Sequence, residues 1–135
     1  MIKTDIDKEI MDQNNYKMKV SELVEKLGLK VHSGESNLDK EVWGGYVSDL
    51  LSDVMGNAGE GMVWITLQTH KNIMAIASLK ELAAVILVRD LLPDDDTAAS
   101  SEAEGIPVLG TSLRTFDIAG KLYEILKNNN LPQGS

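Results

Sequence analysis

Short apolar runs alternate with more polar segments over most of the chain. The two clearest runs are 62–67 and 83–88, and the second (A-A-V-I-L-V) contains no polar residue. An apolar run of this kind, bounded by turn residues, is typical of a strand that is buried on both faces of a sheet. Shorter runs predict further strands at 17–20, 29–32 and 106–109, and the segment 42–51 begins as extended chain.

Signals for helix starts and stops fall between the predicted strands. Pro93 and the aspartates that follow it predict a helix start, because acidic side chains in the first turn interact favourably with the helix dipole. Gly105 predicts the end of that helix. The other predicted helices are 22–27 after Ser21, a short helix through Val54 and Met55, 73–79 capped by Asn72, and 116–126 capped by Thr111 or Thr115.

Strands that alternate with helices predict an α/β fold of three layers, in which helices flank a mostly parallel sheet. We expect residues 17–126 to form a single domain of this kind. Residues 1–16 are predicted to be a polar N-terminal extension, and residues 127–135 a flexible C-terminal tail. Isoleucines at helical spacing in the extension fit either an amphipathic helix or a segment that orders against a partner.

Charge and composition narrow the classes of function. The chain has 135 residues and a formal net charge of −8, which disfavours nucleic acid and membrane surfaces as partners. It contains no cysteine, so disulfides, cysteine zinc sites and thiol catalysis are excluded. No signal peptide and no apolar run of membrane-spanning length is present, and the sequence therefore predicts a cytoplasmic protein.

Two polar segments, each directly after a predicted strand, form the candidate site. In a parallel sheet the carboxyl ends of the strands share one edge, so we expect the two segments to border one crevice. Amides at a helix start and a guanidinium can both bind an anion. The predicted ligand-binding residues are Thr66, Gln68, Thr69, His70, Asn72, Thr111, Ser112 and Arg114. The alternative is ordinary loop chemistry, in which Asn72 caps a helix and His70 bonds a backbone carbonyl.

Three other groups carry competing interpretations. Asp49 and Asp53 are spaced to share a helix face, either as a solvated surface or as a pair for acid–base or cation chemistry. Gly44 and Gly45 fit a bulge or turn with positive φ, or a close approach to a ligand. The aspartates after Pro93 lack the spacing of a calcium loop, and we predict no metal site.

From residue 42 to residue 126 the order of features resembles the DRTGG domain family. The matching segments are G-G-Y-V-S-D-L-L-S-D-V-M (44–55), W-I-T-L (64–67), A-A-V-I-L-V (83–88) and G-I-P-V-L-G-T (105–111), followed by 115–126. Similar domains lie beside CBS domains in some pyrophosphatases, occur in some phosphotransacetylases, and exist as small stand-alone proteins. Their fold is related to the N-terminal domain of HPr kinase/phosphorylase. The position of the family's polar motif reads Q-T-H-K-N here and lacks the family's basic and acidic pair.

The resemblance implies a non-catalytic, regulatory or protein-interaction module that forms a homodimer and senses a small anionic, nucleotide-like ligand. We predict no resident cofactor. Two alternatives remain open. One is a small enzyme that uses His70 with Asp49 or Asp53 as an acid–base pair. The other is an accessory subunit that acts on a larger complex, such as a redox enzyme.

Overall fold

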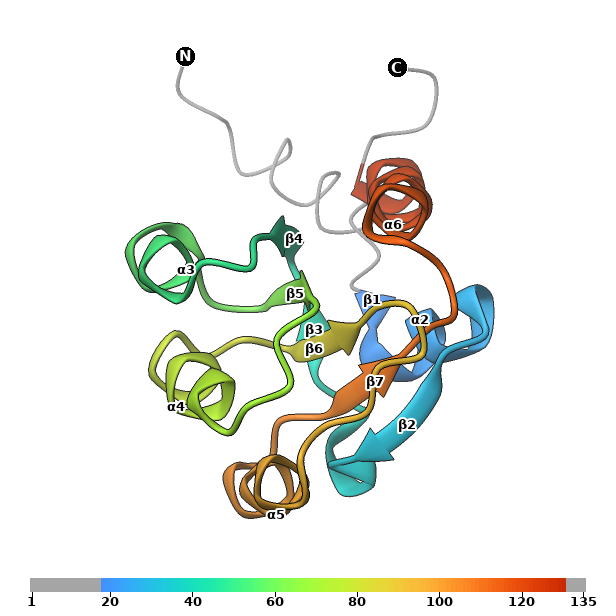
Figure 1. The fold of residues 1–135 in the computed structure, drawn as a ribbon. Coiled ribbons are helices and arrows are strands. Elements are labelled where there is room, and N and C mark those ends of the chain that lie inside the picture. Colours follow the sequence, from blue (N-terminus) through green and yellow to red (C-terminus); the bar gives the residue numbers. More distant parts are fainter. Residues whose placement is uncertain (1–17, 131–135) are drawn as a thin grey trace.

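A computed structural model gives the fold and describes residues 18–130. One sheet of five strands has the order β2-β7-β6-β5-β4 (Figure 1). Four of its strands are parallel to one another, and β2 runs antiparallel to β7. The predicted class, a mostly parallel three-layer α/β fold, is confirmed. The strands are β2 (Lys30–Ser33), β4 (Gly44–Val47), β5 (Met62–Thr66), β6 (Ala84–Leu87) and β7 (Val108–Gly110).

Helices cover both faces of the sheet (Figure 1). On one face lie α3 (Leu51–Asn57), α4 (Asn72–Leu79) and α5 (Asp95–Glu104). On the other lie α2 (Val20–Leu27), α6 (Thr115–Asn130) and a small ribbon in which β1 (Met18–Lys19) pairs with β3 (Glu41–Val42). No helix among residues 18–130 is long and apolar enough to cross a bilayer.

The core has two layers because side chains alternate across a strand. Val63 and Ile65 of β5 pack in a cluster with α2 and α6, whereas Trp64 between them packs in a cluster with α3 and α4. The same alternation applies to β6, where Ile86 belongs to the first cluster and Val85 to the second. All of β6 is buried, which explains its uninterrupted apolar sequence.

The predicted bounds of two helices need correction. Helix α2 begins at Val20 and not at residue 22, so the strand predicted to end at residue 20 ends at Lys19. The Lys19 amide donates to Glu22 Oε1 at 3.3 Å and stabilises this earlier helix start. Helix α6 continues to Asn130, beyond the predicted end at 126 and into the predicted tail. The extension 1–16 and residues 131–135 of the tail lie outside the described residues.

Gly44 and Gly45 form neither a turn nor a bulge. Both lie inside β4, and neither has a positive φ. A Cβ at Gly45 would lie 3.1 Å from Leu122 Cδ2, so the missing side chain lets α6 pack closely on the edge of the sheet. The reason for this glycine is therefore a contact with a helix far away along the chain.

Candidate functional site

The two predicted polar segments lie on the same rim of the sheet, and a third loop separates them. The loops that follow β5, β6 and β7 are neighbours because those strands are parallel and adjacent. The loop after β6 is hydrogen-bonded to both of the others. The Arg89 amide donates to the Leu113 carbonyl at 2.9 Å, and the Asp94 amide donates to the Thr69 carbonyl at 3.1 Å. The rim is thus a connected set of three loops.

Asp49 connects the loop after β4 to the end of β5. Its Oδ1 accepts hydrogen bonds from Thr66 Oγ1 at 2.8 Å and from the Leu67 amide at 2.9 Å. Its carbonyl accepts from Gln68 Nε2 at 2.9 Å. Thr66 and Gln68, both predicted as ligand-binding residues, therefore have structural partners. Asp49 precedes α3, so it does not share a helix face with Asp53, contrary to that interpretation of their spacing.

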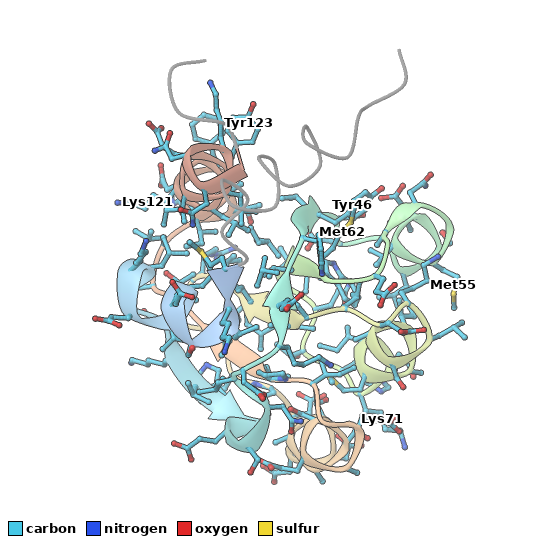
Figure 2. The ribbon with its side chains drawn as sticks, turned by 180° about the vertical axis from the view of Figure 1, so that it is seen from behind. Tyr46, Met55, Met62, Lys71, Lys121 and Tyr123 are labelled. Atoms are coloured by element: carbon cyan, nitrogen blue, oxygen red, sulfur yellow. The ribbon has the colours of Figure 1, made fainter. Side chains whose placement is uncertain are left out.

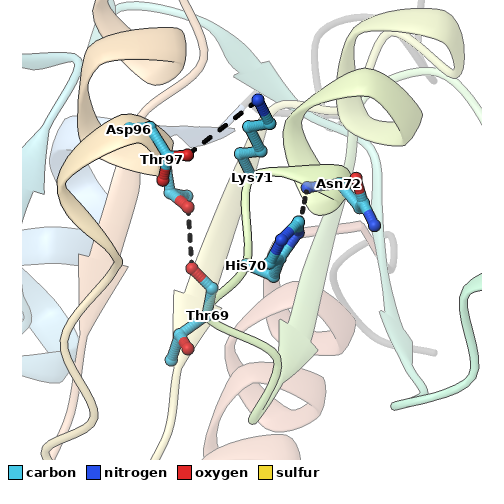
Figure 3. A network of polar contacts seen from close by, with 6 residues as sticks. All are labelled: Thr69, His70, Lys71, Asn72, Asp96 and Thr97. Atoms are coloured by element: carbon cyan, nitrogen blue, oxygen red, sulfur yellow. Dashed lines mark hydrogen bonds and ion pairs between the residues drawn. The ribbon is translucent and has the colours of Figure 1, made fainter.

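The loop after β5 is also connected to α5 (Figure 3). Thr97 Oγ1 donates to the Thr69 carbonyl at 2.7 Å, and Thr97 is fully buried. Lys71 Nζ lies 4.0 Å from Asp96 Oδ2, and both side chains are exposed. Exposed ion pairs contribute little to stability, so the buried Thr97 contact is the stronger connection. Thr69 thus acts through its backbone carbonyl.

Asn72 is not the cap of α4 that the sequence predicted: Lys71 occupies the N-cap position, and the side chain of His70 stabilises the helix start instead. The Asn72 amide donates to His70 Nδ1 at 3.1 Å (Figure 3), and Asn72 is the first residue of α4. His70 therefore satisfies an amide that the helix itself leaves without a partner. Both side chains are exposed at the start of α4.

The acid–base alternative has no support in these contacts. In the described part of the chain, His70 makes no hydrogen bond with Asp49 or Asp53. Asp53 accepts from the Tyr46 hydroxyl at 2.9 Å and from Asn57 Nδ2 at 3.0 Å. Nor do His, Cys, Asp and Glu side chains within residues 18–130 form a group of three that could hold a metal ion.

The Tyr46–Asp53 contact gives a prediction for pH. The hydrogen bond to Asp53, then burial and the carboxylate charge, raise the pKa of Tyr46. Its stabilising contribution is therefore present below the ordinary tyrosine pKa and is lost as pH rises through the folded-state pKa. We expect an ultraviolet absorbance titration to show one phenol that ionises late and is missing from Tyr46→Phe. Late ionisation that persists in Tyr46→Phe would assign the shift to another tyrosine.

A hollow of about 430 Å³ lies on the rim between the two predicted segments. It is lined by Leu67 from the loop after β5, Arg89 from the loop after β6, and Arg114, Thr115 and Phe116 at the start of α6. We call it the arginine hollow. Both arginines are exposed, and neither forms an ion pair with another described residue. The start of α6 adds the positive end of a helix dipole to the two guanidinium groups.

A second hollow, of about 840 Å³, lies on the other side of the loop after β7, and we call it the lysine hollow. Its lining includes Lys26, Lys30, Asp90, Thr111, Ser112, Lys121 and Glu124. Its lysines are accompanied by acidic residues, so its charge is more nearly balanced than that of the arginine hollow. Thr111 Oγ1 accepts from the Leu113 amide at 3.1 Å.

The structure therefore divides the predicted residues. Arg114 lines the arginine hollow, whereas Thr111 and Ser112 line the lysine hollow. The other five predicted residues belong to the loop after β5 or to its two ends. Sequence reasoning missed Arg89 and Phe116. Arg89 directly follows the apolar run 83–88, so the rule that placed the other segments on the rim also applies to it.

Comparisons with known proteins show a shared fold. No model of a known protein family matches the chain, and no curated sequence is similar to it. Among solved structures, it is similar to the CBS and DRTGG domains of the regulatory region of Clostridium perfringens pyrophosphatase, complexed with the activator diadenosine tetraphosphate. The TM-score is 0.62 at 14% identity, over 98% of this chain and 53% of the other. The chain thus spans about half the length of that structure.

Proposed function

We propose that the protein is a DRTGG-type regulatory module that binds a small anionic, nucleotide-like ligand in the arginine hollow and catalyses no reaction. One observation carries the proposal. Two arginines from different loops line the same hollow as the start of α6, although the chain has a net charge of −8. Neither guanidinium is neutralised by a carboxylate within the described residues.

The chemistry of the hollow suits a phosphate ester. A guanidinium forms paired, charge-assisted hydrogen bonds with phosphate oxygens, and a helix start favours negative charge. Phe116 is 88% exposed and Leu67 is 39% exposed, so both offer apolar surface to a planar base beside the phosphate site. An inorganic anion would use only the arginines, whereas a nucleotide would use both kinds of surface.

The likeness to the pyrophosphatase regulatory region supports the regulatory part of the proposal. That region is complexed with a dinucleotide activator, which makes nucleotides the first ligands to test. The carboxylates of Asp49 and Asp53 each already accept hydrogen bonds from neighbouring residues. These contacts favour a binding role for the protein over acid–base catalysis by the two aspartates.

Calorimetry tests the proposal with inorganic phosphate, AMP, ATP and diadenosine tetraphosphate as ligands. We expect a nucleotide to bind and to bind more tightly than inorganic phosphate. Arg89→Ala and Arg114→Ala should each weaken that binding about tenfold or more, because each removes a charge-assisted contact. Lys121→Ala, in the lysine hollow, is the matched control and should leave the affinity unchanged.

Two results would contradict the proposal. The absence of heat with every ligand would remove the ligand-sensing role. A loss of binding in Lys121→Ala, with both arginine variants unaffected, would assign the ligand to the lysine hollow instead.

A further inference from the structure

The lysine hollow collects ammonium groups from three separate elements. Lys26 belongs to α2, Lys30 begins β2, and Lys121 belongs to α6. All three residues are exposed. Because the chain as a whole carries a net charge of −8, this cluster reverses the charge locally. The volume of about 840 Å³ lies within the range of about 300–1,000 Å³ that is typical of small-molecule sites.

Two carboxylates line the same hollow. Asp90 comes from the loop after β6, and Glu124 lies on α6, one turn after Lys121. Within residues 18–130, no ion pair joins either carboxylate to a lysine of the hollow. The hollow therefore presents both ammonium donors and carboxylate acceptors. A matching ligand needs an anionic group for the lysines and hydrogen-bond donors for the carboxylates.

The backbone holds Asp90 at the hollow in an unfavourable conformation. Arg89 and Asp90 have φ +57° and φ +58°, in the left-handed region that L-residues rarely adopt. The Asp90 amide donates to the Thr111 carbonyl at 2.9 Å, and the Arg89 amide donates to the Leu113 carbonyl at 2.9 Å. These consecutive side chains thereby line different hollows, Arg89 the arginine hollow and Asp90 the lysine hollow. Strained residues of this kind concentrate at ligand sites.

We propose that the lysine hollow binds a sugar phosphate, with the phosphate against the lysines and sugar hydroxyls donating to Asp90 and Glu124. A phosphate monoester carries a charge of about −1.5 to −2 at pH 7 and has three acceptor oxygens, so it can satisfy several ammonium groups at once. Hydroxyl groups supply the donors that the two carboxylates lack. Both kinds of charged group in the hollow then have a partner on one ligand.

Other classes of ligand fit this lining less well. A ligand that is anionic at every end, such as citrate, would place like charge against Asp90 and Glu124. A nucleotide base finds the aromatic ring of Phe116 in the arginine hollow, whereas none of the described residues that line the lysine hollow is aromatic. The two hollows thus suit different ligands. The inference goes beyond the proposed nucleotide site and does not depend on it.

Calorimetry of the full chain gives the first test, with glucose 6-phosphate, fructose 6-phosphate, ribose 5-phosphate, inorganic phosphate and citrate as ligands. We expect at least one of the sugar phosphates to bind about tenfold or more tightly than inorganic phosphate or citrate, because only it uses both kinds of charged group. The inference is overturned if none of the sugar phosphates gives heat, or if inorganic phosphate or citrate binds as tightly as all of them.

Removal of single lysine charges locates the phosphate. Lys30→Met and Lys121→Met keep most of the apolar stem, and each should weaken binding of the sugar phosphate about tenfold, because each removes a charge-assisted contact. Lys71→Met is the matched control. Lys71 is exposed and lies far from Lys121 (Figure 2), so the same loss of charge there should leave the affinity unchanged. Equal losses in all of these variants would show only a long-range effect of net charge and would contradict a site in the hollow.

Asp90→Asn tests the contact with the sugar. Asparagine tolerates the left-handed conformation, so the loop after β6 keeps its shape. The change removes a charged acceptor for hydroxyls and also a charge that repels phosphate. The ratio of the affinities for the sugar phosphate and for inorganic phosphate should therefore fall about fivefold. An unchanged ratio would show that Asp90 makes no contact with the sugar.

His32 gives a measurement that needs no substitution. Its imidazole lies against Gly110, which lines the hollow. Burial, and then the charge of Lys30, lower the pKa of His32. A phosphate bound at Lys30 offsets that charge, so an NMR titration should show the pKa of His32 rise when the sugar phosphate is added. A pKa of His32 that stays the same with ligand bound would contradict a phosphate at Lys30.

One further variant separates this inference from the proposed function. Arg114→Ala, in the arginine hollow, should weaken nucleotide binding and leave the affinity for the sugar phosphate unchanged. Loss of sugar phosphate binding in Arg114→Ala, with both lysine variants unaffected, would move the phosphate to the arginine hollow and overturn the inference. Nucleotide binding is measured independently, so failure here leaves the nucleotide proposal standing.

Discussion

Gly34→Ala is expected to lower the free energy of unfolding by about 3–5 kcal/mol. Gly34 has φ +75°, a conformation that costs an L-residue about 1–2 kcal/mol. A Cβ there would also lie 2.6 Å from Pro107 Cα and 2.9 Å from Pro107 N. These neighbours are backbone atoms at the entrance to β7, so no change of rotamer can relieve the overlap. The Gly34 amide, which donates to Glu102 Oε1 at 2.7 Å, would be displaced as well.

Gly28→Ala separates the two causes. Gly28 has φ +63°, and nothing lies within 4 Å of the position that a Cβ would take. It should therefore lose only the conformational part, about 1 kcal/mol. Urea denaturation of the two variants and the wild type gives both values. Equal losses in the two variants would show that the region around Pro107 can move, and that the contact between the Gly34 turn and β7 is soft.

The elements that the sequence predicted correctly are those whose signals are local. The run 83–88 contains no polar residue because both faces of β6 are covered, and α5 begins and ends at the predicted acidic and glycine signals. Hydrophobic pattern and helix caps are read over a few neighbouring residues. These signals therefore predict the element correctly without any knowledge of its tertiary contacts.

The features that the sequence left open depend on distant contacts. Nothing in the segment 29–32 shows that β2 runs antiparallel to β7. The two glycines of β4 looked like a turn, but Gly45 is required by the approach of Leu122. Both answers come from elements more than 70 residues away along the chain. Such contacts between distant elements cannot be predicted from the residues next to either position.

The residues of the candidate site also divide into those that local sequence signals predicted and those that depend on distant contacts. Arg114 was recognised because a polar segment follows a predicted strand. Thr66 and Gln68 belong to the same kind of segment, yet both bond Asp49, from a loop that the sequence did not connect with them. Arg89 was missed because it stands alone after its strand. A rim residue is therefore recognised by its position after a strand more reliably than by the polar residues around it.

Trp64→Ala should cost about 3–5 kcal/mol of unfolding free energy and also weaken ligand binding. Trp64 is fully buried in β5, and its Nε1 donates to the Ser48 carbonyl at 2.8 Å. Truncation leaves a cavity and removes the hydrogen bond that holds the loop after β4 against the sheet. Asp49 lies in that loop and bonds the Leu67 amide, so the wall of the arginine hollow that contains Leu67 should lose its fixed position.

Trp43→Ala is the matched control, because Trp43 is 57% exposed and should cost far less. The chain has only these two tryptophans, so each variant leaves a single fluorophore. The emission of Trp64 in Trp43→Ala should be blue-shifted and should change only on global unfolding, whereas Trp43 in Trp64→Ala should emit as an exposed indole. Full nucleotide affinity in a folded but destabilised Trp64→Ala protein would show that the arginine hollow does not depend on the hydrogen bond from Trp64 to Ser48. The ligand would then be held without the support that Trp64 gives to the loop after β4.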